Sequence, residues 1–175
     1  EFRVERILNW GFTGRDEAAV RAHVDELEAE GITAPDEIPT AYPKPNHLLT
    51  TGDEIEVPSA ETSGEAEFVL LPGEDEIFVA VGSDHTDRGL EEESIVLSKT
   101  VCPNVMSESV WRFSDVADHW DEIELRSFTS PTGERSPYQT ATLESITPPE
   151  ALLELTAEWL SEPIHVSYHQ TETAD

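Results

Sequence analysis

The chain is short of positively charged residues, and above all of lysine. Ten of its 175 residues are lysine or arginine, against 38 aspartates and glutamates, and the formal net charge is −28. Lys44 and Lys99 are its two lysines. A polyanion of this kind repels the phosphates of nucleic acids and the surface of an anionic membrane, so we expect neither as a partner.

Cysteine and long apolar runs are also scarce. Cys102 is the single cysteine, which excludes an internal disulfide and favours a reducing compartment. No apolar run approaches the roughly 20 residues of a membrane-spanning helix. No basic segment followed by an apolar one indicates a secretion signal. We therefore expect a cytoplasmic protein.

The acid excess itself is typical of cytoplasmic proteins from salt-loving organisms, whose surfaces are rich in acids and poor in lysine. High salt screens the repulsion between such charges. Most acidic motifs in this chain are therefore expected to be solvated surface, and a functional motif must be argued against that background.

The order of expected elements favours the α+β class. Helices are predicted near residues 14–31 and 148–160, and strands near 3–10, 53–58, 64–71, 76–82, 122–128, 138–146 and 164–169. Residues 34–46 and 95–106 are expected to be extended. Because the strands outnumber the helices and do not alternate with them, we predict a β-rich domain of mixed, mainly antiparallel sheets with a few flanking helices.

A single domain is expected over residues 1–175. Within it, residues 1–60 form an N-terminal strand, helix and loop portion. Residues 61–146 form a core with a hairpin and the candidate site, and residues 147–175 form a C-terminal helix and tail.

The predicted hairpin brings carboxylates together. With a turn centred on Gly73 and Glu74, Glu67 faces Ala80, and Glu65 faces Gly82. Asp84, just past the second strand, is then expected beside Glu65. Three carboxylates at close range repel one another unless a cation or protons intervene, and oxygen ligands suit Mg²⁺ or Mn²⁺, with Ca²⁺ as another candidate. The alternative is a solvated acidic turn.

The segment "VGSDHTDR", residues 81–88, carries a family resemblance. An E-x-E strand precedes it, and a lysine followed by a proline comes after it. In this order the motifs resemble the fumarylacetoacetate hydrolase-like superfamily (2-keto-4-pentenoate hydratase type), and in particular an uncharacterised subfamily with a GSDHTDR motif. The matching positions are Glu65, Glu67, Asp84, Thr86, Arg88, Lys99 and Pro103.

The resemblance implies a β-rich roll and a metal ion held by Glu65, Glu67 and Asp84. It also implies chemistry on 2-oxo acids or 1,3-dicarbonyl compounds, often in a homodimer. Ser83 stands where that superfamily usually has asparagine, and no counterpart of its water-activating histidine and carboxylate is found.

Four further residues are candidates for the chemistry. Lys99 is expected to be a second electrophile, and His85 a general base or, alternatively, a supporting hydrogen-bonder. Arg88 could bind a substrate carboxylate or pair with nearby acids. Thr86 could contact substrate or bond to its own loop. A zinc site at His165 and His169 is less expected, and Cys102 is expected to be structural.

Together these observations predict a divalent-metal-dependent hydrolase or lyase acting on a small oxo acid or dicarbonyl compound. The metal would polarise the carbonyl and stabilise an enolate. A non-catalytic module of the same fold that binds a small ligand or metal is the alternative. A third possibility is a structural subunit whose acids serve only salt adaptation.

Overall fold

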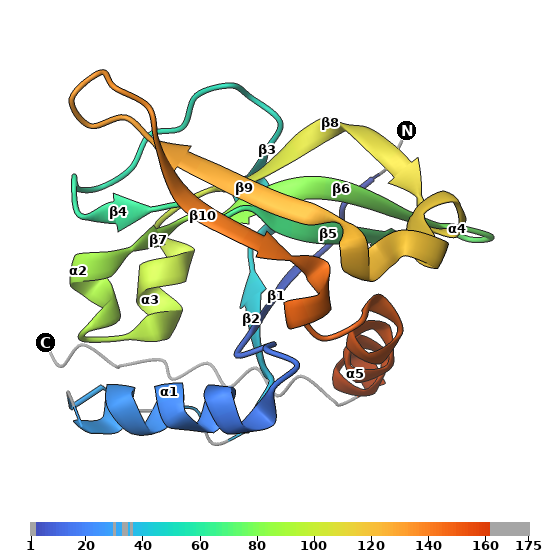
Figure 1. The fold of residues 1–175 in the computed structure, drawn as a ribbon, viewed down its shortest axis with the longest axis horizontal. Helices are drawn as coiled ribbons and strands as arrows, with labels where there is room; N and C mark the ends of the chain where they lie inside the picture. Colours follow the sequence, from blue (N-terminus) through green and yellow to red (C-terminus); the bar gives the residue numbers. More distant parts are fainter. Residues whose placement is uncertain (1–2, 30, 33–34, 36, 162–175) are drawn as a thin grey trace, which may run out of the picture.

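The computed structural model describes residues 3–29, 31–32, 35 and 37–161, and within them it is an α+β protein (Figure 1). Mixed and antiparallel sheets carry a few helices, which confirms the expected class. The finer expectation, a roll of the fumarylacetoacetate hydrolase type, rested on the resemblance and is not confirmed. The division of the chain into one domain with three portions stays a prediction.

A four-stranded sheet forms the centre of the fold, in the order β3-β8-β6-β5. β5 (Glu67–Pro72) and β6 (Ile77–Asp84) are the predicted antiparallel hairpin, β8 (Asn104–Arg112) pairs antiparallel with β6, and β3 (Leu49–Thr50) pairs parallel with β8. The hairpin is confirmed, but β6 continues to Asp84, so this aspartate is part of the strand.

A second hairpin, β9 (Glu124–Thr129) with β10 (Ser136–Thr142), crosses the face of this sheet (Figure 1). Between the two layers lies an apolar core around Trp120, which packs edge-on against Phe68 and Phe113 with ring centroids 5.1 and 5.4 Å away. Alternation along β6 directs Val79 into this core. The neighbouring residues of β6 therefore face the opposite side, where the candidate site lies.

On that opposite side, β1 (Ile7–Gly11) pairs antiparallel with β2 (Thr40–Lys44). The prolines around β2 predicted a loop instead of a strand. Proline has no backbone N–H to donate. In a two-stranded sheet each strand is an edge strand whose outer side needs no donor, so exposed Pro43 is tolerated in β2. Because side chains alternate along a strand, Tyr42 and Lys44 share one face, and both are buried there.

Residues 95–106 contain a helix, contrary to the expected extended segment. α3 (Ile95–Thr100) begins where the Ser94 hydroxyl accepts a hydrogen bond from the Leu97 amide at 3.3 Å. A short apolar run fits a strand or a helix equally, and this cap decides for the helix. α3 packs against α2 (Arg88–Glu91), which Asp87 caps in the same way, and β7 (Thr86–Asp87) pairs with β4 (Thr62–Ser63).

The remaining elements lie around these layers. The two long helices agree with the prediction, whereas residues 53–58 form no strand. The predicted strand at 164–169, with His165 and His169, lies outside the described residues. The elements that lie around the central layers are α1 (Glu17–Ala29), η1 (Asn46–Leu48), α4 (Phe113–Val116), η2 (Ala117–Glu122), η3 (Leu143–Ser145) and α5 (Pro149–Ser161).

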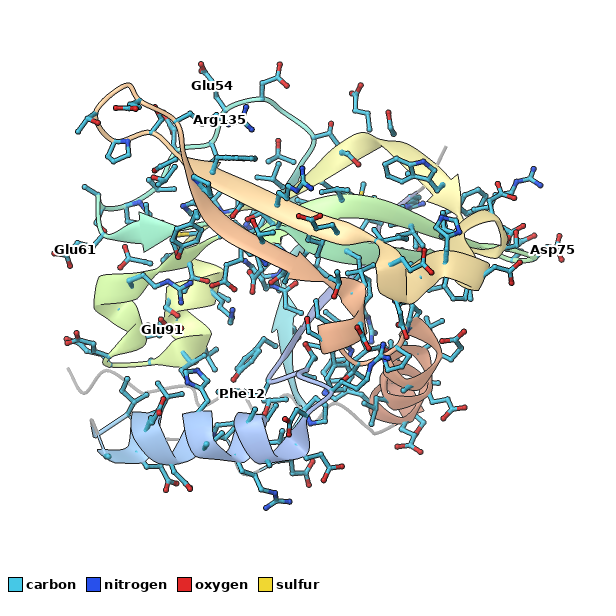
Figure 2. The ribbon with its side chains drawn as sticks, viewed as in Figure 1. Phe12, Glu54, Glu61, Asp75, Glu91 and Arg135 are labelled. Carbon is cyan, nitrogen blue, oxygen red and sulfur yellow. The ribbon has the colours of Figure 1, made fainter. Side chains whose placement is uncertain are left out.

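Acidic side chains project outward from the rim of the molecule, as Glu54, Glu61 and Asp75 illustrate (Figure 2). All three are exposed. Within the described part of the chain, no helix combines the length and the apolar character needed to cross a membrane.

Candidate active site around Asp84

Both lysines of the chain converge on one carboxylate. Asp84 ends β6 with its side chain 4% exposed. One of its oxygens accepts a hydrogen bond from Lys99 Nζ at 2.7 Å, and the other accepts from Lys44 Nζ at 3.3 Å. The lysines come from different elements, β2 and α3, and stand 55 positions apart in sequence. A chain with two lysines places both of them at a single buried aspartate.

Lys44 is fully engaged with the protein. Its side chain is 0% exposed, and besides Asp84 it donates to the backbone carbonyl of Cys102 at 3.0 Å and to Oδ1 of Asn104 at 2.5 Å. The Asn104 amide in turn donates to Asn9 Oδ1 on β1 at 2.7 Å. Burial lowers the pKa of Lys44 more than Asp84 raises it. Its three N–H bonds each have an acceptor, so Lys44 holds Asp84 in place and has no donor left for a ligand.

Lys99 differs from Lys44 in having capacity to spare. Its side chain is 17% exposed, and Asp84 is its single hydrogen-bond acceptor among the described residues. Its ammonium also lies 5.9 Å from the ring centre of Tyr42. Burial alone would lower the pKa of Lys99, but the attraction and hydrogen bond of Asp84 outweigh it and raise the pKa. Lys99 is therefore a protonated ammonium with two N–H bonds available to a ligand.

Glu67 lies close to Asp84 and Lys99, and its pKa is strongly shifted. Burial raises its pKa to about 7, and repulsion from Asp84 adds to the effect, while Lys99 opposes it. No described residue hydrogen-bonds to the carboxyl of Glu67 in the structure. A carboxyl group in this state exchanges its proton near neutral pH, as a general acid or base must. We call Lys44, Glu67, Asp84 and Lys99 the lysine centre.

The hairpin register explains why Glu67, and not Glu65, is the closer carboxylate. The loop between the strands is Gly73–Glu76, so Pro72 pairs with Ile77 and Glu67 pairs with Gly82. The predicted turn lay one position too early and placed Glu65 opposite Gly82. The observed register differs from the predicted one by two residues. Each side chain therefore stays on the predicted face of the sheet but has a different cross-strand partner.

Glu65 and Arg88 form a separate ion-pair group at the edge of the site. The Arg88 guanidinium donates to Ser63 Oγ at 2.6 Å, to Glu91 at 2.8 Å and to Glu65 at 3.4 Å. Burial opposes the charge of Arg88, yet Glu91 and Glu65 raise its pKa overall. All three of its nitrogens already have partners. Of the two roles expected for Arg88, its geometry matches pairing with nearby acids.

The remaining candidates, His85 and Thr86, follow Asp84 but do not join the lysine centre. Thr86 is 2% exposed, and its hydroxyl donates to the carbonyl of Asp84 at 3.1 Å. His85 lies against Gly64, as does Ser83, and its Nε2 is buried with no hydrogen-bond partner among the described residues. Burial, and then the charge of Arg88, lower the pKa of His85, so the imidazole is neutral at pH 7. Its role as a base stays a prediction.

The three carboxylates expected to hold a metal do not form a ligand set as they lie. In the part of the chain that the structure describes, no group of three or more histidines, cysteines, aspartates or glutamates is arranged to hold an ion. Both oxygens of Asp84 accept from ammonium groups, and Glu65 pairs with Arg88. The positive charge next to Asp84 thus comes from Lys44 and Lys99. Binding of Mg²⁺, Mn²⁺ or Ca²⁺ stays a prediction.

Sequence reasoning missed Lys44, Tyr42 and Asn104. The prolines around Lys44 predicted a loop where the structure has strand β2. The apolar run before Asn104 predicted an extended segment where the structure has helix α3. One signal could have found Lys44: in a chain that has lost nearly all its lysines, each remaining lysine is a candidate for a buried, paired position.

Comparison with known proteins overturns the family resemblance. No curated protein and no solved structure matches the chain. The sequence pattern of one family matches residues 10–166. Nothing indicates the fumarylacetoacetate hydrolase-like superfamily, so that assignment was wrong: E-x-E, D-x-T-x-R and a lysine are short motifs that an acid-rich chain readily contains. The chain belongs to the family described as "Protein of unknown function (DUF2848)".

Proposed function

We propose that this protein is an enzyme, a lyase or hydrolase, that forms or protonates an enolate on a small 2-oxo acid or 1,3-dicarbonyl compound. One observation carries the proposal. Both lysines of the chain meet at buried Asp84. Lys99, the partly exposed one, keeps N–H donors that no described residue accepts, and its charge acts on Glu67.

Lys99 supplies the positive charge that such a substrate needs. An ammonium with two free donors binds a carboxylate or a carbonyl oxygen, and it stabilises the negative charge that develops on that oxygen as an enolate forms. Asp84 raises the pKa of Lys99, so the group stays charged at neutral pH and acts as an ammonium, not as an amine nucleophile. Asp84 and Lys44 fix its position.

Glu67 supplies the proton transfer. A carboxyl group with a pKa of about 7 is present in both protonation states at neutral pH. It can remove a proton from the carbon next to a carbonyl group, or return one to an enolate that C–C cleavage or decarboxylation has produced. An enolate is the shared intermediate of these reactions, so the lysine centre serves the whole class.

No step of the proposed reaction uses a metal ion, because Lys99 supplies the positive charge and Asp84 is already paired with two ammonium groups. Chelation should therefore leave the exchange reaction described below unchanged. A loss of activity on chelation that Mg²⁺ or Mn²⁺ restores would instead support the predicted ion at Glu65, Glu67 and Asp84.

The direct test is exchange of hydrogen for deuterium next to a carbonyl. The protein is incubated in deuterated buffer with molar KCl and pyruvate, 2-oxobutyrate or a 1,3-diketone, and proton NMR follows the loss of signal at the carbon next to the carbonyl. We expect wild-type exchange above the buffer rate. Lys99→Met and Glu67→Gln should each lower it about 100-fold or more, because a positioned acid or base contributes on the order of 10²- to 10⁴-fold.

The matched controls are Arg126→Met and Glu124→Gln. These residues form an exposed ion pair on β9, outside the lysine centre, and should leave the exchange rate unchanged. Exchange that persists in Lys99→Met and Glu67→Gln would contradict the proposal. Oxo-acid binding without any exchange would also contradict it and would favour the non-catalytic binding module.

A further inference from the structure

A hollow of about 580 Å³ lies beside Tyr42, whose ring in turn lies 5.9 Å from the Lys99 ammonium of the lysine centre. It lies between β2, together with residues 32, 35 and 37 before it, and the start of α3. Its lining combines apolar residues, among them Ile32, Ile95, Val96 and Tyr42, with polar ones such as Thr40 and Ser94. Val96 is 52% exposed, so no described residue covers this apolar side chain fully.

One contact and one helical spacing place this hollow near Lys99. The ring of Tyr42 lines the hollow and also lies 5.9 Å from the Lys99 ammonium, so one side chain belongs to both. In addition, Ile95 and Lys99 are four positions apart on α3, and residues at that spacing lie on the same face of a helix. A molecule whose anionic end reaches Lys99 therefore has the hollow within reach of its other end.

The charges around the hollow restrict what that other end can be. Glu37 and Glu93 both contribute to its lining, and Glu93 is exposed. A second carboxylate in the hollow would meet these like charges, whereas an uncharged chain would cover Val96 and Ile95. Charge and surface together favour a neutral, apolar group.

We propose that this hollow binds the apolar tail of the substrate, so that the protein prefers monocarboxylic oxo acids with an apolar chain to short or dicarboxylic ones. This inference rests on the proposed function, because Lys99 must bind the carboxylate or carbonyl at the other end. Ile95, Val96 and Tyr42 then determine specificity for tail length, and Glu93 excludes a second negative charge.

The test is a series of dissociation constants from calorimetry, with pyruvate, 2-oxobutyrate, 2-oxohexanoate and 2-oxoglutarate. Each buried methylene should tighten binding roughly two- to fourfold. Val96→Trp should fill the hollow and weaken 2-oxohexanoate about tenfold or more while pyruvate is unaffected. Leu97→Trp is the matched control, since Leu97 is 54% exposed on the same helix but does not line the hollow.

A charge reversal provides a second, independent readout. Glu93→Lys should tighten 2-oxoglutarate roughly three- to tenfold, because a repulsive charge becomes attractive. The neighbouring Glu92→Lys should not, since Glu92 lies outside the hollow. A gain of affinity cannot result from misfolding, so this variant keeps the inference testable if Val96→Trp is unstable.

Three results would overturn the inference. Equal affinities for all tail lengths, with Lys99-dependent exchange intact, would show that the hollow does not bind the tail, and the proposed function would still hold. Tail-dependent binding that Lys99→Met does not weaken would show that the hollow and Lys99 hold different molecules. Failure of every oxo acid to bind would refute the proposed function, and the inference with it.

Discussion

Asp84 is a buried carboxylate whose charge is balanced by two ammonium groups, one of them completely enclosed. Removing its charge leaves Lys44 without a counter-ion in the interior, and an uncompensated buried charge costs several kcal/mol. The aspartate is therefore expected to matter for folding as well as for chemistry.

Asp84→Asn should lower the free energy of unfolding by about 3–5 kcal/mol, because it breaks a buried pair from one side. Asp121→Asn is the control. Asp121 pairs bidentately with Arg15, but both side chains are solvent-exposed, so its loss should cost much less. Denaturant unfolding in molar KCl measures both, and equal losses would contradict the burial of the lysine centre.

Glu67 makes stability depend on pH. Folding raises its pKa from 4.5 to about 7, so the folded protein binds this proton more tightly than the unfolded chain does. The resulting stabilisation is complete below about pH 4.5 and is lost as the pH rises to about 7, by roughly 3 kcal/mol in total.

Glu67→Gln removes this titration. The free energy of unfolding of wild type minus that of Glu67→Gln should therefore fall between about pH 4.5 and pH 7 and be constant above that range. Comparing the two proteins at one salt concentration cancels the titration of the surface acids. A difference that is flat from pH 4.5 to pH 7 would show that Glu67 is not perturbed.

At the scale of elements, the β5–β6 hairpin and β8 place the site, and Gly82 lies on β6 between Glu67 of β5 and Met106 of β8. A Cβ atom at Gly82 would lie 2.6 Å from Val69 Cγ2 and 2.7 Å from the backbone oxygen of Val105. Only a residue without a side chain permits this approach.

Gly82→Ala should lower the free energy of unfolding by about 1–3 kcal/mol, because the strands must separate to admit the methyl group. Since Gly82 lies opposite Glu67, the exchange rate should fall as well. Gly52→Ala is a milder control, with the Thr50 hydroxyl as its nearest neighbour at 3.3 Å. Unchanged stability in Gly82→Ala would contradict the strand register.

The hairpin also shows how far the sequence predicts structure. Two continuous apolar runs on either side of Pro72 and Gly73 were enough to predict β5, β6 and their pairing. The position of the turn could not be predicted, because the sequence is compatible both with the four-residue loop and with a turn one position earlier. This choice shifts the strand pairing by two residues and decides whether Glu65 or Glu67 pairs with Gly82. Lys44 could not be placed at all, since its contact with Asp84 depends on how β2 packs against the central sheet.

At the scale of the whole molecule, the net charge of −28 governs the conditions under which the fold is stable. The screening length falls from about 10 Å at 0.1 M salt to about 3 Å at 1 M. Repulsion between the exposed acids is therefore strong in dilute buffer and weak in concentrated salt.

The midpoint of thermal unfolding should rise steadily from 0.1 M to 2 M KCl. Replacing four exposed acids of α1 with their amides should make that rise shallower, because less repulsion remains to be screened. The acids are Glu17, Asp25, Glu26 and Glu28. A midpoint that does not change with salt, in either protein, would contradict this explanation of the acidic surface.

Nuclear magnetic resonance of the two lysines tests the central claim most directly, because a chain labelled with ¹³C at the lysine ε-carbons gives only two signals. Lys99→Met assigns them. The account predicts that the pKa of Lys44 lies below 10.5 and that of Lys99 above it, and that 2-oxohexanoate shifts the Lys99 signal. Two lysines that titrate together as solvent-exposed amines, with neither responding to the oxo acid, would contradict it.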